Sequence, residues 1–336
     1  MARKPPRLAG LPLWLIGAAA ALATLAVALF VAPMLLPGPP ARQGEETVVM
    51  APRGAGLNQI AAILEKEGVI TSRASFIGFA RAVGAADQLK AGEYAIPSQA
   101  SMARIVAILA SGKSIQHRIT IPEGWTSAMA LRRIAAAEFL EGPAPAPPPE
   151  GALLPATYFF TRGTSRAEAV AEMKEAHDAV VADLWPQRAR DLPFSTIEEA
   201  ITLASIVEKE TAEAEERPRV AAVFVNRLRL GMKLESDPTI IYGVTKGEPL
   251  GRRIRRSEIE MAHPWNTYVI PGLPPTPIAN PGRDAIAAVL NPPSTDELFF
   301  VADGTGGHAF ARTYAEHNAN VERWRAIQRD RGLRKD

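Results

Sequence analysis

The sequence contains no cysteine in its 336 residues, and it has only five histidines. The absence of cysteine excludes disulfide bonds, thiolate nucleophiles and cysteine-bound zinc or iron–sulfur centres. The histidines are scattered without HExxH or other metal-ligand spacing: His117, His177, His263, His308 and His317. We therefore expect neither a metal nor a cofactor.

The sequence also has no large excess of positively or negatively charged residues. The 38 Lys and Arg residues nearly balance the 36 Asp and Glu residues, which leaves a formal net charge of +2. Proteins that bind nucleic acid through bulk charge are strongly basic. We therefore expect no nucleic-acid partner.

Near the N-terminus, charge is absent over a long stretch. No charged residue occurs between Arg7 and Arg42, and 11–36 is almost wholly apolar. A helix of roughly 20 apolar residues spans a bilayer. A cleaved signal peptide is the alternative, but the apolar run is longer than a signal peptide requires. We predict a cytoplasmic basic tail at 1–10 and a transmembrane helix at 11–36, with the rest of the chain across the membrane.

Two further segments follow the apolar run. Residues 37–46 are rich in Pro, Gly and charge, and they predict a linker. Residues 47–116 predict a small strand–helix–helix–strand module that ends in a further helix, with Ser72 capping its second helix. Such a module either packs as a spacer or binds polysaccharide, and its residues alone leave both interpretations open.

The remainder, 117–330, mixes helices and strands. A proline-rich insertion at 143–149 cannot be helix or central strand. Hydrophobic periodicity predicts helices at 165–184 and 195–211, and a glycine turn at 304–307 predicts a hairpin near the C-terminus. Because the elements show no regular strand–helix–strand alternation, we predict an α+β fold.

One predicted helix ends in two carboxylates, within the sequence TLASIVEKET. Ser195 and Glu198 match a capping box at its start. Successive helical residues advance by about 100°, so Glu208 and Glu210 lie about 200° apart around the axis. Only one of them can enter a given cleft, and the other is a surface charge or supports the first.

A carboxyl group at the edge of an apolar face acquires a raised pKa and can act as a general acid near neutral pH. Glycosidic bonds are cleaved by such acids. The segments 236–243, 263–282 and 301–318 gather Asn, Tyr, Trp, His and Asp between turns. These side chains suit contacts with sugar rings, although the same residues also close turns.

Four stretches together resemble the YceG-like family of membrane-anchored endolytic murein transglycosylases: LASIVEKET, RVAAVFVNRLRLGMKLESDPTIIYG, NTYVIPGLPPTPIANPG and FVADGTGGHAFARTYAEHN. The resemblance covers roughly 117–325. It implies a LysM-like module at 47–116 and a catalytic domain at 117–330. It also implies a carbon–oxygen lyase that cuts the β-1,4 bond between N-acetylmuramic acid (MurNAc) and N-acetylglucosamine (GlcNAc). The muramic C6 hydroxyl would displace the leaving sugar and form a 1,6-anhydro end, which terminates or trims nascent strands.

The resemblance also implies roles for individual residues. Lytic transglycosylases carry a catalytic glutamate followed by serine, and Glu210 precedes Thr211. Glu210 would serve as acid and then base, with Glu208 as a supporting or alternative carboxylate. Substrate-binding candidates lie in the matching stretches: Asp237, Tyr242, Asn266, Tyr268, Asn280, Asp303, His308 and Asn318. The implied location is the inner membrane with a periplasmic bulk, and the implied partners are glycan strands and peptidoglycan synthases.

Two departures from the family pattern occur. Ala156 replaces a common Asp, and Trp265 replaces a common Tyr. Two alternatives also remain. A hydrolytic muramidase would need a second carboxylate facing Glu210, for which Asp237 or Glu235 is nearest in sequence. A non-catalytic scaffold would bind glycan through the N-terminal module.

Overall fold

The computed structural model describes residues 17–18, 20–22, 24–25 and 34–331. The tail expected at 1–10 lies outside this set, as does most of the transmembrane helix expected at 11–36. Within the described residues, no helix is long and apolar enough to cross a membrane. The chain divides after His117 into two compact units, and 161–163 belong with the first. Each unit is described by itself below.

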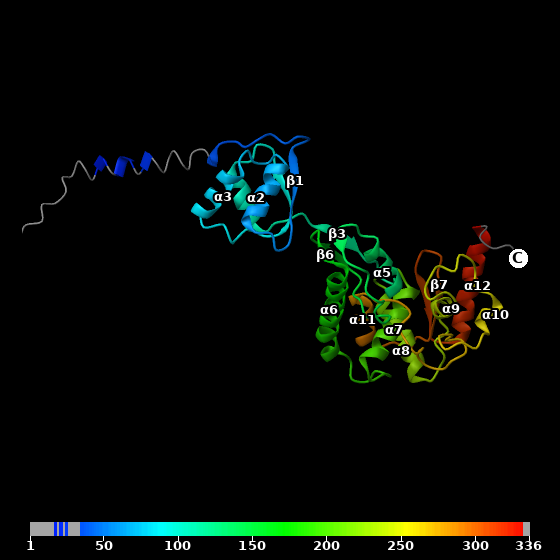
Figure 1. The fold of residues 1–336 in the computed structure, drawn as a ribbon. Helices are drawn as coiled ribbons and strands as arrows, with labels where there is room; N and C mark the ends of the chain where they lie inside the picture. The colour runs from blue at the N-terminus through cyan, green and yellow to red at the C-terminus, as the bar shows by residue number, and fades with distance from the viewer. Residues whose placement is uncertain (1–16, 19, 23, 26–33, 332–336) are drawn as a thin grey trace, which may run out of the picture. The chain divides into compact units, whose positions relative to one another are not determined.

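The N-terminal unit contains a two-stranded antiparallel sheet and three helices (Figure 1). Its elements are β1 (Glu46–Ala51), α2 (Leu57–Lys66), α3 (Arg73–Ala82), β2 (Gly92–Pro97) and α4 (Met102–Ser111). Val49 of β1 pairs with Tyr94 of β2. Tyr94 is fully buried beside Phe76 in a core that all five elements share.

Local signals set the helix ends in this unit. The Ser72 hydroxyl accepts from the Ser75 amide and so caps α3, as the sequence predicts. Ser101 caps α4 in the same way. Gly112 ends α4 in a left-handed conformation with φ of 71°, which glycine adopts without steric cost.

The C-terminal unit combines helices with short two-stranded sheets, and the predicted α+β architecture is confirmed. Its helices are α5 (Ser127–Ala135), α6 (Arg166–Leu184), the 3₁₀ turn η1 (Trp185–Gln187), α7 (Ile197–Glu210), α8 (Arg217–Arg229), α9 (Asp237–Thr245), α10 (Arg256–Ile259), α11 (Arg283–Leu290) and α12 (Tyr314–Asp330). Its strands are β3 (His117–Thr120, whose first residue belongs to the N-terminal unit), β4 (Leu140–Glu141), β5 (Thr157–Phe160), β6 (Thr164–Ser165), β7 (Phe299–Ala302) and β8 (His308–Ala311).

The strands of the C-terminal unit pair two by two. β3 pairs with β5, β4 pairs in parallel with β6, and β7 forms an antiparallel hairpin with β8. The hairpin turn closes where the Asp303 amide donates to the Gly307 carbonyl, as the glycine turn predicts. α12 packs along β7 and β8, at the red end of the ribbon in Figure 1.

Helix α7 lies at the centre of this unit. Every residue from Ala200 to Val207 is buried, because α8 and α11 pack against it together with the surrounding loops. α7 ends at Glu210, and Thr211 leaves it with an extended backbone. The two glutamates therefore stand at the last turn of a helix whose central residues are all buried.

One sequence-based expectation needs correction. The capping box of α7 is formed by Thr196 and Glu199, not by Ser195 and Glu198. Both pairs match the pattern, but only at Thr196 does the chain turn from extended to helical. The segment 236–243, to which the sequence analysis assigns no secondary structure, lies in α9 from Asp237 onward, and its Pro238 lies in the first turn, where proline is tolerated.

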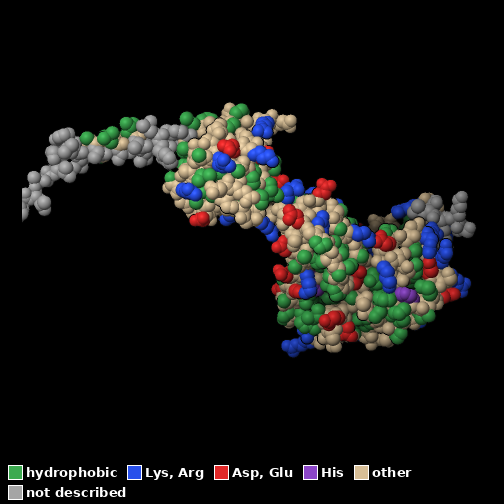
Figure 2. Space-filling model, viewed as in Figure 1, with side chains coloured by type: hydrophobic (Ala, Val, Ile, Leu, Met, Phe, Trp, Pro, Cys, Tyr) green, Lys and Arg blue, Asp and Glu red, His purple; other side chains and the backbone are tan. Residues whose placement is uncertain are grey.

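Acidic and basic side chains are interspersed on the face shown in Figure 2, over both units. Neither sign forms a continuous patch on this face. This distribution agrees with the near-neutral charge of the chain.

Candidate active site

A cavity of about 450 Å³ opens in the C-terminal unit at the end of α7. It lies between the start of α9, the β7–β8 hairpin and α12. Its lining combines charged, imidazole and aromatic side chains with a few apolar ones: Glu210, Arg227, Leu234, Glu235, Asp237, Tyr268, Phe300, Val301, Ala302, His308 and His317. Of the sequence-predicted residues, Glu210, Asp237, Tyr268 and His308 are thus brought together.

Glu210 contributes to this cavity a carboxyl group whose pKa is strongly raised. Burial raises the pKa of Glu210 to about 7, and the nearby Asp237 charge adds to the effect. A hydrogen bond from the Ser236 hydroxyl and the positive charge of Arg227 partly offset this rise in the pKa. At neutral pH the group is close to half protonated, which suits a general acid.

Asp237 and Tyr268 form a hydrogen-bonded pair beside Glu210. The Tyr268 hydroxyl donates to Asp237 Oδ1 at 2.8 Å. Burial raises the pKa of Tyr268, and the Asp237 charge raises it further, so the phenol stays neutral. Asp237 itself is exposed at the start of α9. A second carboxylate therefore borders the cavity in which Glu210 lies.

His308 borders the same cavity from β8. Its Nδ1 lies 2.7 Å from Glu216 Oε2, and its backbone amide donates to Glu216 Oε1 at 2.8 Å. His317, on α12, stacks on Phe299, and burial lowers the pKa of this histidine. Two imidazoles thus line the same cavity as the carboxyl at the end of α7.

Arg227 forms the cationic part of the lining. Its guanidinium donates to the carbonyls of Leu298, Lys233 and Leu234 and pairs with Glu235 at 3.1 Å. The side chain is only 9% exposed. These bonds tie the loop before α9 to the β7 strand, and so they fix two walls of the cavity.

Glu208 faces away from this cavity, as helical geometry predicts. Its side chain is only 4% exposed, so it is not a surface charge. Glu208 accepts from the Gly282 amide at 2.8 Å and lies 3.4 Å from Arg217. Burial raises the pKa of Glu208, although the Gly282 bond opposes the rise. Glu208 therefore joins α7 to α8 and to the start of α11.

Three other predicted residues are buried in hydrogen-bonded positions outside the cavity lining. Asn280 accepts from the Leu153 amide at 3.0 Å and donates to the Trp125 carbonyl at 2.9 Å. Asn266 donates to three backbone carbonyls around the end of α10. Tyr242 packs on Trp265, with its hydroxyl 3.4 Å from Glu150. In this structure the two asparagines join loops to one another, and Tyr242 joins α9 to the segments that carry Trp265 and Glu150.

The last two predicted residues also lie outside the lining. The Asp303 carboxylate accepts from the Thr305 amide at 2.7 Å, within the turn between β7 and β8. Asn318 is exposed on α12. Their assignment to substrate binding stays a prediction.

Sequence reasoning missed Ser236, Arg227 and Glu216, which contact or orient the cavity residues. The only sequence signal for Ser236 is its position directly before Asp237, which the sequence indicates as a substrate-binding candidate. The contacts of Arg227 and Glu216 with the cavity depend on the tertiary packing of α8 against the hairpin, which no local motif records.

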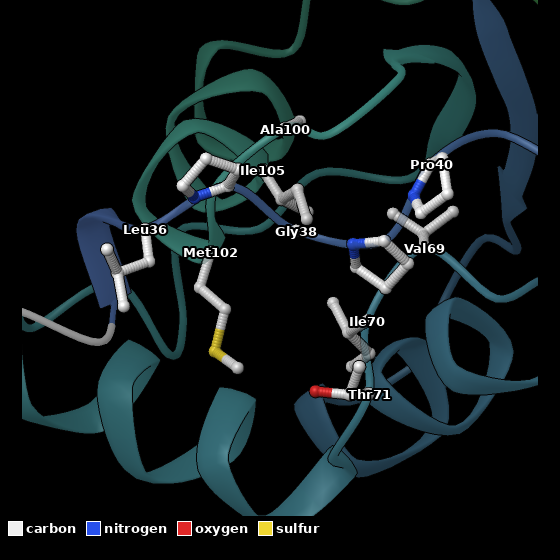
Figure 3. A pocket seen from close by; sticks show the side chains of 11 residues that line it. Leu36, Gly38, Pro40, Val69, Ile70, Thr71, Ala100, Met102 and Ile105 are labelled. Carbon is white, nitrogen blue, oxygen red and sulfur yellow. The ribbon is translucent and has the colours of Figure 1, made fainter.

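The N-terminal unit contains a different cavity of about 440 Å³ (Figure 3). Its walls are Leu36–Pro40, Val69–Thr71, Ala100, Met102 and Ile105. Since none of these side chains titrates, acid–base chemistry cannot take place there. Across the described residues of both units, no cluster of three or more His, Asp or Glu has a metal-binding arrangement.

Comparison with known proteins gives a consistent result. The family model described as the YceG-like family matches residues 49–323, which includes most of the N-terminal unit. The endolytic murein transglycosylase of Bacillus subtilis strain 168 is 29% identical over 304 residues, covering 81% of this chain and 83% of that protein.

Two further relatives extend the comparison. The endolytic murein transglycosylase of Streptococcus pneumoniae D39 is 29% identical over 319 residues, covering 80% of this chain but only 57% of the streptococcal protein. The crystal structure of a YceG-like protein from Listeria monocytogenes matches with a TM-score of 0.51 and 29% identity, over 82% of this chain and 98% of that one.

Proposed function

This chain belongs to the YceG-like family, and from that premise we propose that it is an endolytic peptidoglycan lytic transglycosylase. It cleaves the β-1,4 bond between MurNAc and GlcNAc inside nascent glycan strands and leaves a 1,6-anhydro-MurNAc end. The observation that carries the proposal is Glu210, a carboxyl with a pKa of about 7 in a sugar-sized cavity. The relatives named as endolytic murein transglycosylases support the choice of substrate.

Glu210 is the acid in this reaction. Its proton passes to the glycosidic oxygen as the bond from that oxygen to muramic C1 breaks, so the GlcNAc side leaves as a neutral hydroxyl. The muramic C6 hydroxyl then attacks C1, which closes the anhydro ring, and its proton passes to the Glu210 carboxylate, which is thereby returned to its acid form. Neither water nor a covalent protein nucleophile is consumed, so one acidic carboxyl is sufficient for leaving-group departure.

Glu208 supports this chemistry indirectly. Because it binds the Gly282 amide and Arg217, it fixes the last turn of α7 relative to α8 and α11. Small displacements of a catalytic group lower the rate steeply. Glu208 is therefore a positioning residue for Glu210.

The layout of the whole chain belongs to the same proposal. The apolar run at 11–36 serves as a single inner-membrane anchor, with the basic tail at 1–10 in the cytoplasm and the two units in the periplasm. The order β1–α2–α3–β2 supports a LysM-like module in the N-terminal unit. A membrane-held position would place the enzyme beside peptidoglycan synthases, its expected partners.

A hydrolytic muramidase is the second candidate, because Asp237 borders the same cavity as Glu210. Inverting glycosidases use a second carboxylate to activate water. Such an enzyme would leave reducing muramic ends.

The test compares Glu210→Gln and Glu208→Gln with the wild type on purified glycan strands. Glu210→Gln should abolish cleavage while the protein stays folded and binds glycan, because the amide protons are not acidic enough to be transferred to the leaving oxygen. Glu208→Gln should retain a fraction of the activity. Undiminished cleavage by Glu210→Gln would contradict the proposal.

A further inference from the structure

We propose that Thr267 and Thr239 are positioning residues for catalysis, because their hydroxyls hold Ser236 where it can donate a hydrogen bond to Glu210. This inference rests on the transglycosylase function proposed above and adds to it two residues that do not line the cavity. Both threonines are fully buried, and Ser236 is only 1% exposed. Their hydroxyls act on Glu210 through Ser236.

The two threonine hydroxyls form a closed ring with the backbone of Ser236. The Thr239 hydroxyl donates its proton to the Ser236 carbonyl at 2.6 Å. The two threonine oxygens lie 2.9 Å apart, and Thr267 must be the donor between them because a hydroxyl has a single proton. The Thr267 oxygen in turn accepts from the Ser236 amide at 3.0 Å. Both the amide and the carbonyl of Ser236 are therefore held by this pair.

Ser236 occupies the position at which a serine usually caps a helix. It directly precedes α9, and a serine at that position ordinarily accepts from an amide of the first turn. Within the described part of the chain, Ser236 makes no such capping bond, and its hydroxyl donates to Glu210 instead. The local preference for capping is thus overridden, and the buried ring fixes the backbone from which this hydroxyl projects.

The same two segments are also joined on either side of the ring. The Glu235 amide donates to the Thr267 carbonyl at 3.2 Å. Glu235 has a left-handed backbone with φ of 53°, which a residue other than glycine keeps only where its surroundings impose it. On the other side, the Tyr268 hydroxyl donates to Asp237. Thr267 therefore lies among contacts that place three residues of the cavity lining.

The consequence for catalysis concerns the proton of Glu210. Burial raises the pKa of Glu210, and the hydrogen bond from Ser236 opposes that rise. If the ring is opened, Ser236 is free to turn its hydroxyl toward the first turn of α9. The pKa of Glu210 would then rise further, and the carboxyl would lose the contact that orients it toward the glycosidic oxygen.

The experiment measures formation of 1,6-anhydro ends as a function of pH by Thr267→Val and Thr267→Ser. Valine has nearly the shape of threonine but no hydroxyl, so Thr267→Val should lower kcat by about 10- to 10²-fold with little change in KM. It should also shift the alkaline limb of the pH–rate profile to higher pH, by up to about one pH unit. Thr267→Ser keeps the hydroxyl and should return both values to near those of the wild type.

A second valine variant opens the ring at a different bond. Thr239→Val removes the donor to the Ser236 carbonyl and the acceptor for the Thr267 hydroxyl. Its kcat and its alkaline limb should move in the same directions as those of Thr267→Val. Thr239→Val therefore tests the proposal even if Thr267→Val does not fold.

A double variant separates positioning from general stability. Because the Thr267 hydroxyl acts through Ser236, Ser236→Ala combined with Thr267→Val should have the kcat and the alkaline limb of Ser236→Ala alone. Thr202→Val is the matched control, since Thr202 is also buried and its hydroxyl donates to the Glu198 carbonyl within α7 at 2.7 Å. This control should leave the pH–rate profile unchanged.

Three results would overturn the assignment of the threonines. They are a wild-type kcat and pH–rate profile in a folded valine variant, a Thr267→Ser variant as impaired as Thr267→Val, and a double variant whose loss of kcat equals the product of the two single losses. Failure of the proposed function would look different, because the wild type itself would then yield reducing ends or no cleavage.

Discussion

The carboxyl of Glu210 should destabilise the fold, and Glu210→Gln should relieve that cost. Moving a glutamate pKa from 4.5 to about 7 means that the folded state binds this proton more tightly than the unfolded state. Stability therefore falls as pH rises from 4.5 to about 7, and the full cost of about 3 kcal/mol remains above that pH. Glutamine has no charge to desolvate and still accepts from Ser236.

Tryptophan fluorescence during urea unfolding measures this effect in the right unit. Four of the five tryptophans lie in the C-terminal unit, namely Trp125, Trp185, Trp265 and Trp324. At pH 8, Glu210→Gln should be more stable than the wild type by up to about 3 kcal/mol, and at pH 4 the difference should vanish. The variant should also be inactive, because the buried carboxyl that destabilises the fold is the one that catalysis requires.

Glu213→Gln is the matched control, since Glu213 is an exposed carboxylate just beyond the same helix. It should leave stability unchanged at both pH values. The reasoning would be refuted if Glu210→Gln were no more stable than the wild type at pH 8, or if its gain were equally large at pH 4.

Three other substitutions test the surrounding network. Ser236→Ala removes the hydrogen bond that lowers the Glu210 pKa, so the alkaline limb of the pH–rate profile should shift to higher pH by about one pH unit. An alkaline limb at the same pH or at a lower pH would contradict this. Asn280→Ala should lower the free energy of unfolding in urea by about 1 to 3 kcal/mol, because the buried Leu153 amide loses its partner while the Trp125 carbonyl keeps the residue-280 backbone amide; a change under about 0.5 kcal/mol would be too small for that role. Arg217→Ala leaves Glu208 buried without its cation and should cost about 3 to 5 kcal/mol; the account fails if Arg217→Ala unfolds at the wild-type urea concentration.

The elements of the fold with local signals could be predicted from the sequence. Ser72 caps a helix where its side chain predicts, and the glycine turn after Asp303 forms the expected hairpin. The start of α7 was placed one residue early, because Ser195 and Thr196 both begin a capping-box pattern.

The candidate site was only partly accessible to sequence reasoning. Helical geometry separates Glu208 from Glu210, and the structure shows them contacting different elements. Spacing along α7 does not reveal that Glu208 meets Arg217, since that contact depends on how α7 packs against α8. The pairing of His308 with Glu216 joins residues 92 positions apart and has no local signature.

The central claim is that this chain cuts glycan with formation of an anhydro ring, through Glu210. The most direct measurement is mass spectrometry of the ends released from purified peptidoglycan strands by the wild type and by Glu210→Gln. The account predicts 1,6-anhydro-MurNAc ends from the wild type, lighter by one water than reducing ends, and none from the variant. Reducing muramic ends alone, or anhydro ends from Glu210→Gln at the wild-type rate, would contradict it.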